Sequence, residues 1–303
     1  MRKSENPLEV RWEDEQTGEV RHHLRGLLVL NLVTFLWGTT FTVVKIAEAH
    51  LNPAVIVFLR FGIAALCFLP YLPRLIQPRQ LWVGLELGFW LWIGYATQAI
   101  GLKTTTPSQS AFITALNVIL VPLFLGLVGR KIPRIIWISA LLAVLGVGLL
   151  SYDGSQPTIG DLWTLGCAAS YALYIVRLEA LAPRFPSLEL AAAQVFGVLP
   201  FALGWSLLSG PLPNWHSVPW LALVYLGVLA TALTTWLQTL GQGHVAATEA
   251  AIIYTLEPVW ATLFAFVFLG QSLGWQGLLG ASLVVVATLV SQLPGPRSRV
   301  EES

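Results

Sequence analysis

The segment Tyr95-Ala-Thr-Gln98-Ala-Ile-Gly101 recurs in altered form 140 residues later, as Thr235-Trp-Leu-Gln238-Thr-Leu-Gly241. The alignment pairs glutamine with glutamine and glycine with glycine. It continues from Ser110-Ala111-Phe-Ile113 to Ala250-Ala251-Ile-Ile253, and from Leu116-Asn117 to Leu256-Glu257. A constant offset over this length predicts an internal duplication.

The duplication extends toward the N-terminus at a slightly different offset. At 134 residues, Trp37-Gly38 pairs with Tyr171-Ala172, Pro53 with Ser187, and Arg60 with Gln194. The second copy is the more divergent over these two helices, since Tyr171 and Gln194 replace a tryptophan and an arginine. Two nearly equal offsets across four predicted helices therefore indicate two related halves.

The composition excludes several classes of protein. Apolar residues make up 55% of the 303 residues and charged residues only 11%, and 15 of the 33 charges lie in the tails 1–25 and 294–303. Soluble domains carry about 25% charged residues, and a net charge of +1 offers no basic surface for nucleic acid. A soluble enzyme, a disordered protein and a nucleic-acid binder are excluded, and an all-α polytopic membrane protein is predicted.

Proline, glycine and charged residues divide the apolar sequence into segments of about 20 residues, the length that crosses a hydrocarbon layer. Ten transmembrane helices are predicted: 25–47, 53–72, 80–102, 107–128, 133–151, 159–181, 187–208, 218–240, 247–269 and 274–293. We expect a cytoplasmic tail at 1–24, five spans at 25–151, five at 159–293 and a second tail at 294–303. Because five is odd, the second repeat enters the membrane inverted, an arrangement typical of secondary transporters.

The positive charges predict the orientation of the chain. With the N-terminus inside, Lys103 falls in an outer loop. Thirteen other cationic residues then lie on the cytoplasmic side: Arg2, Lys3, Arg11, Arg21, Arg25, Arg74, Arg79, Arg130, Lys131, Arg134, Arg184, Arg297 and Arg299. We therefore expect both termini to be cytoplasmic, in an inner (plasma) membrane of bacterial type, because the loops are short and the N-terminal tail does not resemble a cleavable signal.

Several motifs resemble those of a known family. They are Trp37-Gly38-Thr-Thr-Phe41, Leu59-Arg60-Phe61, Leu256-Glu257-Pro258 and the stretch from Asn117 to Pro122. In this order they resemble the EamA-type transporters of the drug/metabolite transporter superfamily. The resemblance covers residues 25–293. It implies ten helices in two five-helix inverted repeats, and export or exchange of small metabolites, often amino acids.

Two ionisable residues lie deep in predicted spans, where a charge costs at least about 2.5 kcal/mol. Glu257 is about ten residues, or roughly 15 Å, into the ninth span. It could bind a substrate ammonium group or carry a proton, or it could fix the kink at Pro258. Arg60 could bind a substrate carboxylate or tie together carbonyl groups of neighbouring helices. The two could also pair in one transport state.

Polar and aromatic residues on the repeat helices complete the candidate substrate-binding site. They are Trp37, Gln98, Asn117, Tyr171, Tyr174, Gln238, Tyr254 and Trp260. The glutamines could line the two mouths of the pathway or could pack helices together. The aromatic residues could wall a pocket, or could pack in the core or face lipid.

Other residues are expected to have structural roles. Cys67 and Cys167 should be buried free thiols, without disulfide or metal spacing. Gly84-x-x-x-Gly88 and the series Gly270, Gly274, Gly277 and Gly280 predict close helix packing. The last helix of each repeat suits a peripheral support or a homodimer contact. Lys45, Glu48, Lys103, Arg177, Glu179 and Glu249 should reach the membrane edge, whereas Glu86 lies deeper and the sequence offers no role for it.

These features favour a secondary transporter that exports or exchanges amino acids or related zwitterions by alternating access. A multidrug exporter of lipophilic cations is the alternative, and an integral-membrane enzyme, a receptor or a channel is more distant. There is no His-Glu-x-x-His motif and no phosphate-binding Gly-x-x-x-x-Gly-Lys-[Ser/Thr] motif. We expect no cofactor or metal. The expected partners are a small-molecule substrate and the lipid bilayer, without nucleic acid.

Overall fold

The structure is a computed structural model that describes residues 7–75, 77–151, 154, 156–210, 215, 218–269 and 274–292. These residues form helices and connecting turns, without a strand among them. The predicted tail 294–303 and Gly270 lie outside the described residues. The side chain of Lys45 lies outside them as well.

The first repeat consists of α1 (Pro7–Gly38), α2 (Thr40–Glu48), α3 (Pro53–Cys67), the 3₁₀ turn η1 (Leu69–Tyr71), α4 (Leu72–Leu75), α5 (Pro78–Gly101), α6 (Pro107–Ala115), α7 (Asn117–Leu127) and α8 (Arg134–Ser151). Proline begins α3, α5 and α6, where its missing N–H costs nothing and its fixed φ suits a helix. Residues 7–24 are helical and continuous with the first apolar segment.

The second repeat consists of α9 (Ile159–Leu181), the 3₁₀ turn η2 (Ala182–Arg184), α10 (Ser187–Leu208), α11 (Trp220–Gly227), the π-helical turn η4 (Val228–Leu233), α12 (Thr234–Gln242), α13 (Ala247–Tyr254), α14 (Glu257–Leu269) and α15 (Trp275–Ser291). A capping box formed by Thr158 and Asp161 begins α9.

Five helical segments of the described chain are long and apolar enough to cross a membrane: Gln109–Leu127, Arg134–Ser151, Ile159–Arg184, Ser187–Leu208 and Trp220–Gln242. The pair Pro53–Cys67 and Leu69–Leu75, bent by 65°, would make a sixth. Large apolar side chains on the outside, such as Leu208 and Leu221, are almost fully exposed. The chain is therefore an all-helical, multi-pass membrane protein, while the count of ten spans stays a prediction.

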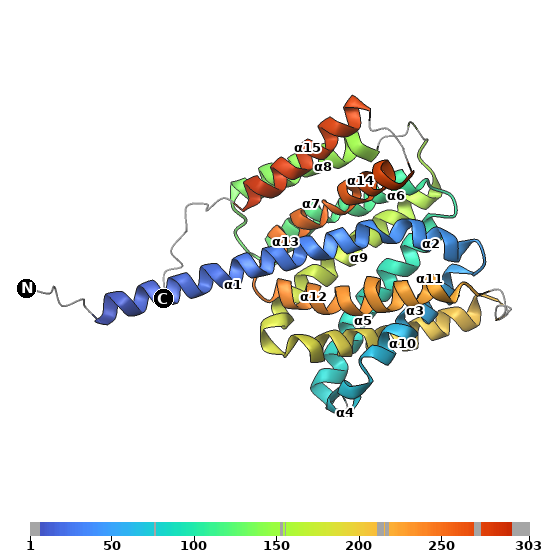
Figure 1. The fold of residues 1–303 in the computed structure, drawn as a ribbon, viewed down its shortest axis with the longest axis horizontal. Helices are drawn as coiled ribbons and strands as arrows, with labels where there is room; N and C mark the ends of the chain where they lie inside the picture. The colour runs from blue at the N-terminus through green and yellow to red at the C-terminus, as the bar shows by residue number, and fades with distance from the viewer. Residues whose placement is uncertain are drawn as a thin grey trace, which may run out of the picture.

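Figure 1 shows how the helices are arranged. The α8 and α15 helices lie side by side at one edge of the bundle, and α5 packs against both α9 and α10. The long α1 helix runs along the bundle and contacts α12, α13 and α14, while its N-terminal turns extend beyond the other helices. Contacts between the two repeats thus make up most of the core.

Glycine contacts allow the closest of these packings. The prediction is confirmed for Gly84, Gly88 and Gly280 but was wrong for Gly274, where an added Cβ atom would meet nothing within 4 Å. A Cβ atom on Gly197 would lie 1.9 Å from the carbonyl oxygen of Gly84, so α5 and α10 meet backbone to backbone. A Cβ atom on Gly280 would lie 2.6 Å from the carbonyl oxygen of Gly146. The last helices of the two repeats therefore pack on each other within one chain.

Some expectations about single residues were wrong or incomplete. Cys167 is buried, but Cys67 is exposed, because it lies on an outward face of α3. Glu86, which the sequence left without a role, forms an ion pair with Arg177, with an Nη2–Oε2 distance of 3.0 Å. Glu179 pairs with Arg130 at 2.6 Å, and Glu249 lies 3.6 Å from His23. All three pairs join residues that are far apart in the sequence and lie on different helices or turns, so the sequence could not relate them.

Candidate functional site

Four predicted spans have irregular backbone near their middles. The α1 and α2 helices are separated at Thr39, α6 and α7 at Leu116, and α13 and α14 at Thr255 and Leu256, while η4 interrupts the path from α11 to α12. Irregular backbone at membrane depth is tolerated where it is buried in protein or lines a cavity. These breaks therefore indicate a candidate site in the middle of the bundle.

Two of the breaks are related by the repeat. Leu116 and Leu256 are equivalent at the offset of 140, and the half-helices that follow begin at Asn117 and Glu257. At both breaks the chain tightens into bonds three residues apart, from Leu116 N to Ile113 O and from Leu256 N to Ile253 O. The polar residues predicted from the repeat thus stand at the start of matching half-helices.

Arg60 of α3 is buried and binds the π-helical turn. Its Nε donates to Thr231 Oγ1, and its Nη2 donates to the carbonyl oxygen of Ala230 at 2.7 Å. The Thr231 hydroxyl in turn donates to the carbonyl oxygen of Leu226, five residues back. These bonds occupy two of the five N–H donors of the guanidinium. Arg60 therefore ties helices together, one of the two roles that the sequence allowed, and keeps further donors.

A pair of tyrosines lies beside Arg60. The guanidinium carbon is 4.8 Å from the centre of the Tyr95 ring, a cation–π contact. Tyr95 meets the edge of Tyr171, with ring centres 6.0 Å apart. Gly94 makes room for Tyr171, because a Cβ atom there would lie 2.2 Å from the ring. Arg60, Tyr95 and Tyr171 form one group contributed by α3, α5 and α9.

Glu257 faces this group across the break between α13 and α14. It is partly exposed, and it interacts electrostatically with Arg60, Tyr95 and Tyr171. Among the residues that the structure describes, no ion pair joins Arg60 directly to Glu257. The site therefore holds a cation and an acid near one another with each side chain free of the other.

The aromatic residues Trp37, Tyr254 and Trp260 gather on the Glu257 side. Trp37 and Tyr254 have ring centres 5.4 Å apart, and Gly38 packs against the Cβ atom of Trp260. The indole nitrogen of Trp260 and Oδ1 of Asn117 are buried and lack a hydrogen-bond partner in the described part of the chain. Buried polar atoms without a partner are uncommon and suit a place where a ligand or water binds.

Other predicted site residues lie in a packed polar layer between the site and the loop 243–246. The Tyr174 hydroxyl donates to Gln194 Oε1 at 2.6 Å, and Gln194 Nε2 donates to Thr239 at 2.9 Å. Gln238 and Tyr254 both donate to Gln242 Oε1. Tyr174, Gln194 and Gln238 are buried, whereas Gln98 is half-buried near the opposite end of α5.

The structure thus brings Trp37, Arg60, Tyr171, Tyr254, Glu257 and Trp260 to the middle of the bundle, and Asn117 begins α7, which packs against α9 and α13. Gln98, Tyr174 and Gln238 are placed away from it. The sequence indicated Tyr95 as one of the aromatic residues that could wall a pocket, but Tyr95 was not among the predicted site residues. No sequence signal marks Thr231.

Comparison with known proteins agrees with this architecture. The model of the EamA-like transporter family matches residues 24–152 and again 158–292. The chain is 31% identical to an uncharacterised transporter of Archaeoglobus fulgidus, over 94% of this chain and 92% of that protein. It is 26% identical to the biotin transporter of Salmonella typhimurium, over 87% and 91% of the two chains.

Two further similarities are informative. The chain is 26% identical to a probable amino-acid metabolite efflux pump of Salmonella typhimurium, over 88% of this chain and 94% of that one. One solved crystal structure superposes with a TM-score of 0.75 at 22% identity, covering 88% of this chain and 96% of the other, which supports the fold. The two family matches fall on the two repeats read from the sequence. The chain belongs to the EamA-like transporter family.

Proposed function

We propose that this protein is a secondary transporter that exports or exchanges amino acids or related zwitterions by alternating access. The observation that carries the proposal is that Arg60 and Glu257 lie close enough to interact electrostatically, without forming an ion pair, at the breaks of the spans. The free donors of Arg60 suit a carboxylate, and Glu257 suits an ammonium group. The aromatic residues beside Arg60 and beside Glu257 suit an apolar side chain.

Inverted repeats provide the means of transport in this proposal. Two nearly equivalent halves can exchange conformations and expose a site at the repeat interface to each side in turn. The proposed topology has ten spans in the inner membrane, with the basic loops and both termini in the cytoplasm. No ATP is hydrolysed by the chain in this scheme, and an ion or substrate gradient drives the exchange.

Two alternative substrates follow from specific observations. Relatives named as biotin transporters favour a monocarboxylate bound by Arg60, with the aromatic residues around its apolar part. The aromatic residues beside Glu257 favour a lipophilic cation, because aromatic faces attract cations. An amino acid uses both charged residues, whereas each alternative uses one.

The test is efflux from proteoliposomes loaded with labelled substrates, with and without an imposed pH gradient. The panel contains individual amino acids, biotin and tetraphenylphosphonium. Saturable efflux of an amino acid supports the proposal, and a steeper rate under the gradient adds proton coupling. Efflux of biotin or tetraphenylphosphonium without any amino acid would overturn the zwitterion and select one of the alternatives.

A further inference from the structure

Two contacts between the repeats are related by the same offsets that define the duplication. Gly101 at the end of α5 meets Gly160 at the start of α9, where a Cβ atom on Gly160 would lie 2.4 Å from the carbonyl oxygen of Gly101. Gly241 at the end of α12 meets Gly26 of α1, where a Cβ atom on Gly26 would lie 3.1 Å from the carbonyl oxygen of Gly241. The offset of 140 relates Gly101 to Gly241, and 134 relates Gly26 to Gly160.

The two contacts lie at opposite ends of the bundle. We call the crossing of Gly26 with Gly241 the basic-end crossing, because Arg25 precedes Gly26 in α1 and because Arg130 and Arg184 belong to turns at this end of the bundle. We call the crossing of Gly101 with Gly160 the opposite-end crossing. The middle of the bundle, with Arg60 and Glu257, lies between them along the helices.

Polar side chains stabilise each crossing, through hydrogen bonds at the opposite end and an ion pair at the basic end. We call each set of polar contacts a fastening. At the opposite end, Asp161 accepts hydrogen bonds from Thr105 Oγ1 at 2.5 Å and from Gln109 Nε2 at 2.8 Å. Its carboxylate also accepts from the backbone N–H of Thr158 at 2.7 Å. The side-chain donors are neutral at every physiological pH, so this fastening contains no group that titrates as histidine does.

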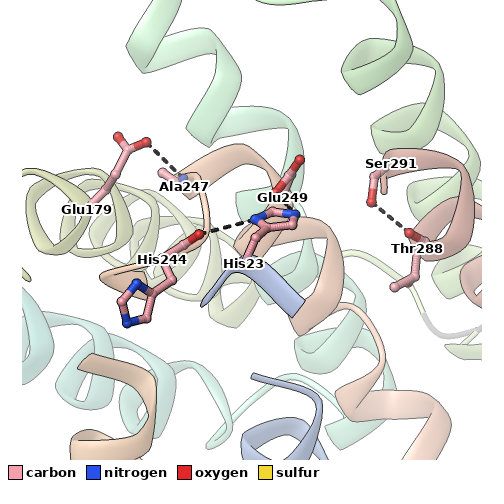
Figure 2. Close-up of polar contacts among 7 residues, drawn as sticks. All are labelled: His23, Glu179, His244, Ala247, Glu249, Thr288 and Ser291. Carbon is pink, nitrogen blue, oxygen red and sulfur yellow. Dashed lines mark hydrogen bonds and ion pairs between the residues drawn. The ribbon is translucent and has the colours of Figure 1, made fainter. Parts of the chain in front are cut away.

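The basic end has an ionisable fastening in the equivalent place, as Figure 2 shows. Glu249 of α13 is the repeat counterpart of Gln109, and its Oε2 lies 3.6 Å from Nε2 of His23 on α1. His23 Nδ1 lies 3.2 Å from the carbonyl oxygen of His244. Oε2 of Glu249 is buried and has no hydrogen bond within the described chain, so a charge on His23 is its stabilising neighbour.

The other ionisable groups near the His23–Glu249 contact are Glu179, His22 and His244, and each has contacts of its own. Glu179 of α9 pairs with Arg130 and accepts a bond from the backbone N–H of Ala247 at 3.2 Å. His22 stacks on His244, with ring centres 5.3 Å apart. Burial lowers the pKa of His244, and the nearby charges of His22 and Arg25 lower it further. His244 is therefore a poorer cation than an exposed histidine, and His23 is the histidine whose ring faces Glu249.

We propose that the two glycine crossings are the two gates of the transport pathway, and that the His23–Glu249 pair makes the basic-end gate responsive to protons. The gating role rests on the proposed transport function, whereas the glycine crossings and the His23–Glu249 contact are features of the structure. The pair holds the gate while His23 is protonated and Glu249 is ionised. A rise in pH that removes the charge of histidine, which occurs between pH 5 and 8, loosens the basic-end gate and leaves the opposite-end gate unchanged.

The test measures gate opening directly, without a substrate. In a full-length background with Cys67→Ser and Cys167→Ala, spin labels are placed at exposed positions on each side of one gate. The pair Leu24→Cys with Ala246→Cys reports on the basic end, and Lys103→Cys with Ile159→Cys reports on the opposite end. Distance distributions are recorded in lipid nanodiscs at pH 6 and pH 8 by double electron–electron resonance.

We expect the open population at the basic end to rise up to about fivefold from pH 6 to pH 8, in keeping with the strength of a partly exposed ion pair. His23→Gln and Glu249→Gln should abolish that response, while Asp161→Asn should leave it intact and open the opposite end at both pH values. A basic end that ignores pH, or one that responds equally in His23→Gln and Glu249→Gln, would overturn the proposal. Size-exclusion profiles confirm that each variant is folded, and a wrong substrate class would leave all these distances untouched.

Discussion

At the scale of single residues, Arg60 has an observed structural role and a proposed role in binding. The sequence allowed it either a carboxylate or the carbonyl groups of neighbouring helices. The structure gives it Ala230 O and Thr231 Oγ1, together with the face of Tyr95. The π-helical turn supplies this partner, since its wider turn is where Thr231 reaches back to Leu226. Such turns occur frequently at functional sites.

Substitution of Thr231 separates the two roles of Arg60. Thr231→Val removes the acceptor of Nε, a bond to a charged group worth about 1.5–3 kcal/mol. We expect KM for the transported substrate to rise about tenfold, with a lower unfolding temperature, and Thr231→Ser to restore both. Transport assays and thermal unfolding of the purified protein measure the two effects.

The control for this experiment is Arg74→Ala, which removes an exposed arginine paired with Glu189. It should change neither quantity by much, because exposed ion pairs contribute little. If Thr231→Val lowers the unfolding temperature and leaves KM unchanged, Arg60 is a structural tie and does not bind substrate.

The residues of the site were partly predictable, for a physical reason. Glu257 and Asn117 stood out because polar groups in apolar spans are costly, and they do begin matching half-helices. Tyr174 and Gln238 have the same polar character, but each is hydrogen-bonded within a packed layer, Tyr174 to Gln194 and Gln238 to Gln242. Glu86 found its partner in Arg177 on another helix. A linear sequence shows the cost of a polar group but not the neighbour that offsets it.

At the scale of helices, close packing of α5 and α10 depends on three glycines, which are Gly84, Gly88 and Gly197. Gly197→Ala would place a Cβ atom 1.9 Å from the carbonyl oxygen of Gly84, so the backbones must separate. We expect a large loss of stability, with little folded protein recovered. The matched control in the same helix is Gly204→Ala, where a Cβ atom meets nothing within 4 Å.

The control should leave stability unchanged or raise it by about 0.5–1 kcal/mol, because alanine favours a helix over glycine. Unfolding temperature in detergent measures both variants. Equal behaviour of Gly197→Ala and Gly204→Ala would mean that α5 and α10 do not meet as the structure has them.

The breaks within helices were harder to predict than the helices themselves. Apolar length predicts a span, and α8, α9 and α10 lie where the sequence places them. Neither the stretch from Thr114 to Asn117 nor η4 contains proline or glycine, so no helix-breaking residue signals those breaks. Pro258 signals the break before α14, because proline removes a backbone donor. The position of a span can be predicted from its apolar composition. A local change of helix type, such as the π-helical turn η4, depends on tertiary contacts such as the bond from Arg60 to Ala230.

At the scale of the whole molecule, the proposed orientation is testable by labelling. Lys103 lies exposed in the loop after α5, and Arg184 lies exposed after α9, at the other end of the bundle. In intact cells, Lys103→Cys should react with a membrane-impermeant maleimide, whereas Arg184→Cys should react only after the cells are permeabilised. The labelling uses a background in which Cys67 and Cys167 are replaced, and the reverse pattern would invert the topology.

The two repeats meet in the middle of the bundle, where Arg60 and Glu257 lie near one another. The family match on each half agrees with the duplication read from Gln98 and Gln238. In the proposed mechanism, Arg60 recognises a carboxylate and Glu257 an ammonium group of one substrate. Each contact can be tested from both sides, by removing the carboxylate or ammonium group from the substrate or by replacing Arg60 or Glu257 in the protein.

The most direct measurement is equilibrium binding of the transported amino acid and of its decarboxylated and deaminated analogues. Wild-type protein should bind the amino acid at least about tenfold more tightly than either analogue, the equivalent of about 1.4 kcal/mol. Arg60→Gln should lose the discrimination against the decarboxylated analogue only, and Glu257→Gln should lose that against the deaminated analogue only. Equal binding of all three compounds to the wild type, or discrimination that survives in both variants, would show that Arg60 and Glu257 do not recognise the two charged groups of the substrate.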